Sequence, residues 1–179
     1  PVLFPNVGKY YGGHFTYNGK AYPMGQHGFA RDTEFEQIAA GEDFVTYRLC
    51  ADEESKKKYP FDFVLEITHR LENNRLSVEW NVKNVDDKEM YFTIGGHPAF
   101  NVNILPDTDF EDYSLVFKEG IETLSYILID AENGTALTDK THKLELTNSK
   151  YALKKDMFDK DALIFDNGQI EWVGLALPN

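Results

Sequence analysis

The sequence contains one cysteine, Cys50, and 18 basic residues against 30 acidic ones, and all of its apolar runs are short. A single cysteine cannot form an intrachain disulfide, so no part of the chain requires an oxidising compartment. The formal net charge of −12 repels phosphate backbones and anionic lipid, and no apolar run approaches the ~20 residues that a membrane-spanning helix needs. The single cysteine, the excess of acidic over basic residues and the short apolar runs predict a cytoplasmic protein that binds neither nucleic acid nor membranes.

Motifs for metals, nucleotides and serine hydrolases are also missing. No two of the five histidines stand two or four positions apart, and no Cys-x-x-Cys occurs, which argues against structural zinc. The acidic residues lack the twelve-residue calcium pattern. The pairs Gly12-Gly13 and Gly95-Gly96 match no nucleotide-binding loop, and there is no G-x-S-x-G. We therefore expect neither a metal nor an organic cofactor.

The chain does contain enough apolar material for one packed core. Its 179 residues are 42% hydrophobic and 14% aromatic, which predicts a single domain over residues 1–179. Both ends, Pro1 to Pro5 and Leu175 to Asn179, are apolar, unlike solvated termini. This favours an internal section of a longer domain, with a processed chain that ends in a short strand as the alternative.

Period-2 patterning recurs along the chain and predicts an all-β, antiparallel sandwich or barrel. Asn18-Gly19 lies between two short strands and is typical of a two-residue hairpin turn. Leu76, Val78, Trp80 and Val82 alternate with polar residues, so we expect that face to be buried. Further strands are expected at residues 43–51, 61–71, 89–94, 113–117, 123–130, 142–147, 161–166 and 169–176.

One short helix is expected, over Asn148 to Lys160. Ser149 could cap it, and Leu153 and Met157 would form its apolar stripe. The charged run Asp52 to Lys58 is interpreted as a solvated loop.

Two histidines stand beside residues that restrict the backbone. His97 lies between Gly95-Gly96 and Pro98, and His27 precedes Gly28. Glycine permits unusual φ and close approach, while proline holds the residue before it in an extended conformation. The residues alone leave two interpretations open: a pair of site histidines, or ordinary loop histidines bonded to backbone carbonyls.

Four segments add a resemblance to a known family. They are Pro1 to Lys9, Phe15 to Lys20, Gln26 to Arg31 and Gly95 to Asn101. In order and spacing they resemble the aldose 1-epimerase (galactose mutarotase) superfamily, and its LacX-like branch in particular. Tyr59 to Phe63 and Asp161 to Phe165 extend the likeness over nearly all of the chain. The resemblance implies a β-supersandwich with a sugar groove on one sheet face.

The resemblance also implies a reaction, the interconversion of α and β anomers of a free hexose by acid/base ring opening. By the family pattern His97 would be the general acid, and His27 would hydrogen-bond the ring oxygen or a neighbouring hydroxyl. Imidazole suits this role because both of its forms are populated near neutral pH. The competing interpretations are a non-catalytic carbohydrate-binding or sensing module and a structural β-domain without a ligand.

The family pattern implies further substrate-binding residues. Lys9 stands where that pattern has arginine, and lysine lacks the bidentate fork. Asp161 would bind sugar hydroxyls or sit in a turn, and Arg31 would line the pocket or pair with Asp32 or Glu34. Phe100 would form an aromatic wall for the sugar or pack in the core.

The family's catalytic base is expected to be missing. The resemblance implies a glutamate in an Ile-Glu-Pro-Trp-type segment, and the nearest match, Ile170-Glu171-Trp172, lacks the proline. We therefore expect a central fragment of a mutarotase-like domain that is inactive alone. We also expect it to self-associate through exposed strand edges.

Overall fold

The protein is described here by a computed structural model that covers residues 1–177. Almost all regular structure is antiparallel strand, with one short α-helix, which confirms the all-β fold class. The residues group into two compact units, Pro1–Pro98 and a second that begins at Ala99. Each unit is described by itself, and the organisation of residues 1–179 as a single domain stays a prediction.

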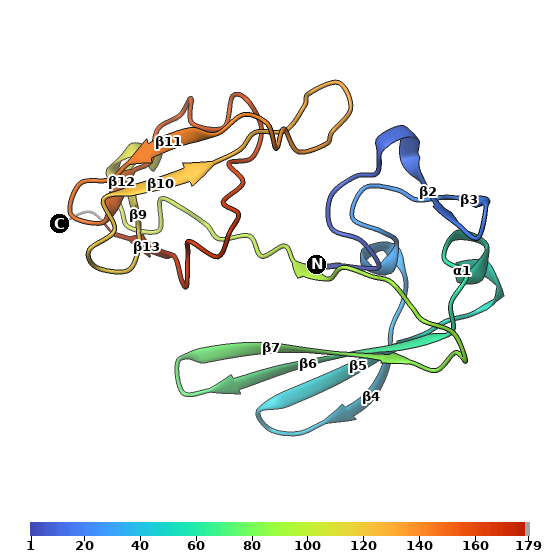
Figure 1. Cartoon of the computed structure of the whole chain (residues 1–179). Coiled ribbons are helices and arrows are strands. Elements are labelled where there is room, and N and C mark those ends of the chain that lie inside the picture. The colour runs from blue at the N-terminus through green and yellow to red at the C-terminus, as the bar shows by residue number, and fades with distance from the viewer. Residues whose placement is uncertain (178–179) are drawn as a thin grey trace. The chain divides into compact units, whose positions relative to one another are not determined.

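The main feature of the first unit is a four-stranded antiparallel sheet in the order β4-β5-β6-β7 (Figure 1). Two of its strands fall where the alternating pattern predicts them, at residues 43–51 and 61–71. The longest ladder joins β6 and β7, which pair over all ten of their residues. The four strands are β4 (Glu36–Ala40), β5 (Phe44–Cys50), β6 (Phe63–Glu72) and β7 (Arg75–Asn84).

A separate hairpin joins β2 (His14–Tyr17) to β3 (Lys20–Pro23). Asn18 has φ +48° and Gly19 has φ +75°, as a primed two-residue turn requires at both central positions. The predicted hairpin is therefore confirmed, including its turn residues.

The core of the first unit is built mainly from aromatic rings. Phe4, Phe61 and Phe63 are almost completely buried, and Tyr59 packs against all three within 6.0 Å between ring centroids. The Tyr59 hydroxyl donates to the carbonyl oxygen of Tyr91 at 2.8 Å, and burial raises the pKa of this phenol. The core thus fixes the position of Phe4.

The prediction of a buried face on β7 is wrong for three of its residues. Leu76, Val78 and Trp80 are 64%, 44% and 39% exposed, respectively. The alternation along the strand is present, but β7 is the outer strand of its sheet. Alternation reports which side chains share a face, and it does not report whether another layer covers that face.

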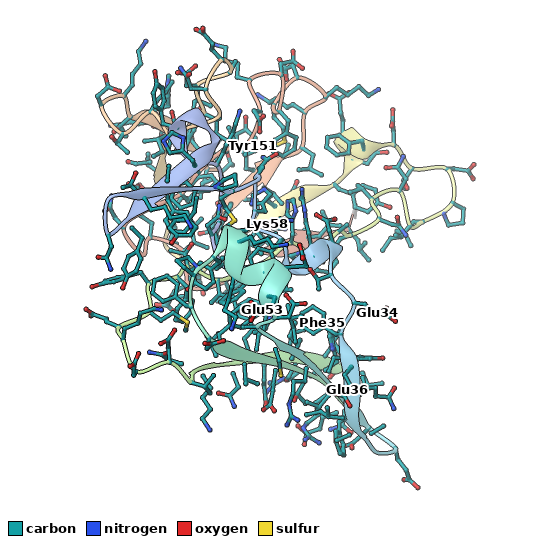
Figure 2. The ribbon with its side chains drawn as sticks, turned by 90° about the vertical axis from the view of Figure 1, so that its right-hand side faces the viewer. Glu34, Phe35, Glu36, Glu53, Lys58 and Tyr151 are labelled. Carbon is teal, nitrogen blue, oxygen red and sulfur yellow. The ribbon has the colours of Figure 1, made fainter. Side chains whose placement is uncertain are left out.

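The only α-helix among residues 1–177 is α1 (Glu53–Lys58), where we expected a loop. The Asp52 carboxylate accepts from the backbone N–H of Ser55 at 2.7 Å, and the Ser55 hydroxyl accepts from the Asp52 N–H at 2.9 Å. This reciprocal cap, with lysines in the last turn, stabilises so short a helix. In Figure 2 the ribbon of α1 runs between the labelled Glu53 and Lys58.

The helix predicted over Asn148 to Lys160 is not formed, so its position was wrong. Asn148 and Ser149 have φ of +52° and +59°, a left-handed conformation that a helix cannot start from. The chain turns there and continues as β12 (Lys150–Ala152).

The second unit contains two small sheets. In one, β9 (Ser114–Val116) pairs with β12 and with β13 (Gly174–Ala176); in the other, β10 (Thr123–Tyr126) pairs with β11 (His142–Glu145). The second sheet is coloured yellow to orange in Figure 1. Three buried side chains, Phe117, Leu124 and Leu144, form the core of this unit.

Two predicted strands are absent. Residues 89–94 form no ladder, because Thr93 donates its backbone N–H to Pro5 instead, at 2.9 Å. Residues 161–166 contribute a single bridge, between Ile164 and Ile127. The remaining short elements are β1 (Val2–Leu3), β8 (Gly95–Gly96) and the 3₁₀ helices η1 (Tyr11–Gly13), η2 (Ala30–Asp32) and η3 (Phe110–Asp112).

Candidate active site

The position of His97 is set by a two-residue strand pair. β1 runs antiparallel to β8, with Val2 opposite Gly96. The backbone N–H of His97 then donates to the carbonyl oxygen of Pro1 at 3.0 Å. His97 is therefore attached to the first residues of the chain, and its side chain is exposed.

The position of His27 is set by Gly28, the residue that follows it, and by the contact of this part of the chain with Phe4. The carbonyl oxygen of Phe4 accepts from the N–H groups of Phe29 and Ala30, each at 3.1 Å, and Phe4 forms a parallel bridge with Gly28. Gly28 has φ +74°, and a Cβ there would lie 2.1 Å from the Phe4 oxygen. Only glycine fits at this point, so the chain turns immediately after His27.

These two attachments bring the histidines together. The ring centroids of His27 and His97 lie 5.3 Å apart, with 51° between the ring planes. His27 is partly buried and His97 is exposed. The structure therefore places the two histidines side by side, and their role as site residues stays a prediction.

His27 is held by two hydrogen bonds to one residue. Its backbone N–H donates to the Gly8 carbonyl at 2.8 Å, and its ring Nδ1 lies 3.0 Å from the Gly8 nitrogen, whose N–H donates to it. The pKa of His27 lies below its usual value, first because the ring is partly desolvated and then because His97 and Arg31 add positive charge. His27 is therefore biased toward its neutral form.

Beside His97 the surface is hollowed by about 420 Å³. The hollow is lined by His97 and by side chains of β6 and β7, among them His69, Val78 and Trp80. Gly96 allows Trp80 to approach, because a Cβ on Gly96 would lie 3.1 Å from the indole ring. The Nδ1 atom of His69 is buried without a hydrogen-bond partner among the described residues.

The analysis of the sequence did not single out Trp80, His69 or Gly8 as site residues. Trp80 and His69 are found on this wall only once the register of β6 and β7 is known, which places His69 opposite Val78 and Ile67 opposite Trp80. No short motif marks Gly8, whose contribution is a backbone amide.

Two other predicted site residues belong to the first unit. Arg31 lies near enough to His27 to affect its pKa, and its Nε lies 3.4 Å from the Asp32 carboxylate, so it makes the expected pair with Asp32. Lys9 directly follows Gly8 and is exposed. Their contact with a sugar stays a prediction.

The remaining predicted residues belong to the second unit. Phe100 is 79% exposed, so it does not pack in a core of the described residues. Asp161 has φ +70°, and its carboxylate accepts from the Ala162 N–H at 2.6 Å, as in a turn. The Glu171 carboxylate lies 2.7 Å from Lys118 Nζ and forms an ion pair with it. The roles of Phe100 and Asp161 in binding stay predictions.

The described residues offer neither a cluster of metal ligands nor a membrane-spanning helix. Residues 1–177 contain no group of three or more potential metal ligands. No helix in that range combines the length and apolar character that a membrane span requires.

The fold and the paired histidines define an all-β protein with a candidate acid/base site. The chain belongs to the aldose 1-epimerase family, whose model matches residues 1–170. Two curated relatives, the plasmid and chromosomal forms of protein LacX from Lactococcus lactis subsp. lactis, are each 32% identical to it over 173 residues. These matches cover 93% of this chain but only 57% of the relatives.

Solved structures agree with this assignment. A galactose mutarotase related enzyme from Lactobacillus acidophilus has a TM-score of 0.90 and 35% identity, covering 99% of this chain and 58% of that chain. A galactose mutarotase-like protein from Lactobacillus casei ATCC 334 has a TM-score of 0.82 and 34% identity, covering 99% and 60%, respectively. The predicted resemblance, including the LacX-like branch, is confirmed.

Proposed function

We propose that this protein takes part in the interconversion of the α and β anomers of a free aldohexose, with His97 as general acid. The observation that supports this is the 5.3 Å separation of the His27 and His97 rings in an accessible part of the first unit. Family membership supports a sugar as the substrate. Galactose is the first hexose to test, because the names of two similar structures contain it.

The reaction needs an acid and a base at the same time. His97 would protonate the ring oxygen while a base removes the proton of the anomeric hydroxyl, so that the bond between the anomeric carbon and the ring oxygen breaks and an aldehyde forms. Rotation about the next carbon–carbon bond and reclosure, with the proton transfers reversed, gives the other anomer. A well-placed proton-transfer group contributes typically about 10²- to 10⁴-fold to such a rate.

The base is proposed to lie outside these 179 residues. The sequence contains no Ile-Glu-Pro-Trp-type segment, and the chain spans 57–60% of the length of the relatives it matches. Glu171 is a poor substitute because it is an ion-pair partner of Lys118. The 179 residues alone are therefore proposed to bind sugar and to have negligible activity.

Exchange spectroscopy by NMR separates binding from catalysis. Galactose and glucose would be titrated into the 179-residue chain and into the product of the complete reading frame. We expect sugar-induced shifts in both and accelerated anomer exchange only in a product that contains the base. Shifts without exchange in every form would instead support a carbohydrate-binding module, and no shifts would remove the sugar assignment.

A further inference from the structure

We propose that the backbone amide of Gly8 fixes the tautomer of His27, so that the ring, to which the family pattern gives a hydrogen bond with the sugar, carries its proton on Nε2 and can only donate there. This inference rests on the proposed function for its chemical meaning. Its structural part, the tautomer, can be tested without any activity.

The tautomer follows from the direction of one hydrogen bond. A backbone N–H can only donate, and the Gly8 N–H points to Nδ1 of His27 across 3.0 Å. Nδ1 must therefore present a lone pair. In a neutral imidazole the single proton then resides on Nε2. That nitrogen can donate to an oxygen lone pair, such as a sugar ring oxygen or hydroxyl, and it cannot act as a base.

The amide of Gly8 is itself held in place by its surroundings. The carbonyl oxygen of Gly8 accepts from the side-chain amide of Asn6 at 3.0 Å as well as from the His27 N–H. One residue earlier, the Val7 N–H donates to the Thr93 hydroxyl at 2.8 Å. The donor that selects the tautomer is therefore positioned independently of the imidazole it contacts.

His27 has a left-handed backbone conformation, with φ of +66°. Among non-glycine residues, Asn, Asp and His are enriched in this region, and the other non-glycine residues with positive φ in the described chain are Asn or Asp, except Ser149. In this conformation the imidazole reaches the backbone amide of Gly8.

Partial burial and nearby positive charge keep His27 neutral. A second proton could enter only at Nδ1, and it would then face the Gly8 N–H and destroy that hydrogen bond. His97 and Arg31 oppose the added charge, and partial burial acts in the same direction. When His97 is protonated in the reaction, its positive charge 5.3 Å away further disfavours protonation of His27.

Long-range ¹H–¹⁵N correlation spectra of the imidazole rings test the tautomer directly. With ¹⁵N-histidine in the 179-residue chain, we expect His27 near pH 7.5 to carry its proton on Nε2 and to show Nδ1 as a hydrogen-bonded acceptor. On acidification it should titrate below the usual pH of ~6.5. A proton on Nδ1 at pH 7.5, or a titration at or above the usual pH, would overturn the inference.

Variants at His27 test its role in the form of the protein that shows exchange. Asn tolerates left-handed backbone and can accept from the Gly8 N–H, but it cannot reach as far as Nε2. We expect His27→Asn to lower the exchange rate by about 10²-fold, as for other lost transition-state donors, with the shape of the pH–rate profile unchanged. His27→Gln, whose amide reaches further, should recover part of the rate.

The outcomes separate this inference from the proposed function. If His27→Asn removes one arm of the pH–rate profile, His27 transfers a proton and the assignment of roles is wrong. If the spectra show the Nε2–H tautomer and no form exchanges anomers, the tautomer stands and the proposed function fails.

Discussion

A Cβ atom on Gly28 would lie 2.1 Å from the carbonyl oxygen of Phe4. Phe4 is fully buried in the aromatic core, so the oxygen cannot move away without displacing that core. Gly28 is thus in direct contact with the N-terminal segment that also holds His97, and no side chain fits between the two backbones.

Replacing Gly28 by Ala should therefore destabilise the first unit strongly. A non-glycine residue in the left-handed region costs about 1–2 kcal/mol by itself, and the clash with Phe4 adds to it. The control is Gly19→Ala, which has nearly the same φ of +75° and nothing within 4 Å of the added Cβ. Urea unfolding would measure the free energy of unfolding of both variants, and equal losses of stability would contradict the proposed close contact.

His97→Asn should lower the rate of anomer exchange at least about 10²-fold, because asparagine cannot donate and recover a proton near neutral pH. Sugar-induced NMR shifts should remain, since the backbone attachment of His97 to Pro1 does not use the side chain. His14→Asn, which alters an exposed histidine, is the matched control. An unchanged rate in His97→Asn would remove this residue from the mechanism.

His27 should make the folded protein less stable at acidic pH. Its pKa is lowered in the folded state, so the unfolded chain binds more protons as the pH falls. This stability is fully present above the usual histidine pKa of ~6.5 and is lost as the pH falls toward the lowered folded value. His27→Asn should weaken the pH dependence of the urea midpoint between about pH 7.5 and 5, whereas His14→Asn should leave it as in the original protein.

Tyr59→Phe should destabilise the protein by about 0.5–1.5 kcal/mol, the usual worth of one buried hydrogen bond. The lost bond is the one that the Tyr59 hydroxyl donates to the carbonyl oxygen of Tyr91. Tyr11 is 74% exposed, so Tyr11→Phe is the control and should be neutral. A neutral Tyr59→Phe would mean that water replaces the hydroxyl.

The exposed face of β7 should promote self-association of the 179-residue chain. We propose a second copy of the chain as its partner, because the outer edge of β7 and its Leu76, Val78 and Trp80 side chains are accessible together. Sedimentation velocity should show concentration-dependent dimers that strengthen with salt, since added salt screens the net charge of −12.

Two lysine substitutions on β7, each of which adds one positive charge, test this association. Val78→Lys puts a cation on the apolar face and should abolish dimers. Asn81→Lys adds the same charge to the opposite face of the strand and should leave them. Monomers in the unsubstituted chain, or equal effects of the two changes, would argue against the surface.

The elements whose conformation depends on residues adjacent in the sequence were predictable from the sequence. Asn18-Gly19 specifies its hairpin by local backbone preference, and the alternating residues of β5 and β6 specify strands. The helix α1 was missed, and a solvated loop was expected instead, because the stability of the helix comes from the reciprocal cap of Asp52 and Ser55.

The site depended on contacts that no local pattern encodes. Glycines beside His27 and His97 indicated restricted backbones, but only the pairing of Val2 with Gly96 and of Phe4 with Gly28 shows that the two rings meet. The exposure of Trp80 could not be predicted either, since it depends on what else packs against the sheet.

Residues 1–8 connect the two histidines, because Pro1 is hydrogen-bonded to the backbone of His97 and Gly8 is hydrogen-bonded to His27. Any substitution that shifts residues 1–8 therefore disturbs both imidazole rings together. A random-mutagenesis screen for loss of sugar turnover should therefore recover substitutions in this stretch that touch no ligand, and such variants should alter the spectra of both histidines in parallel.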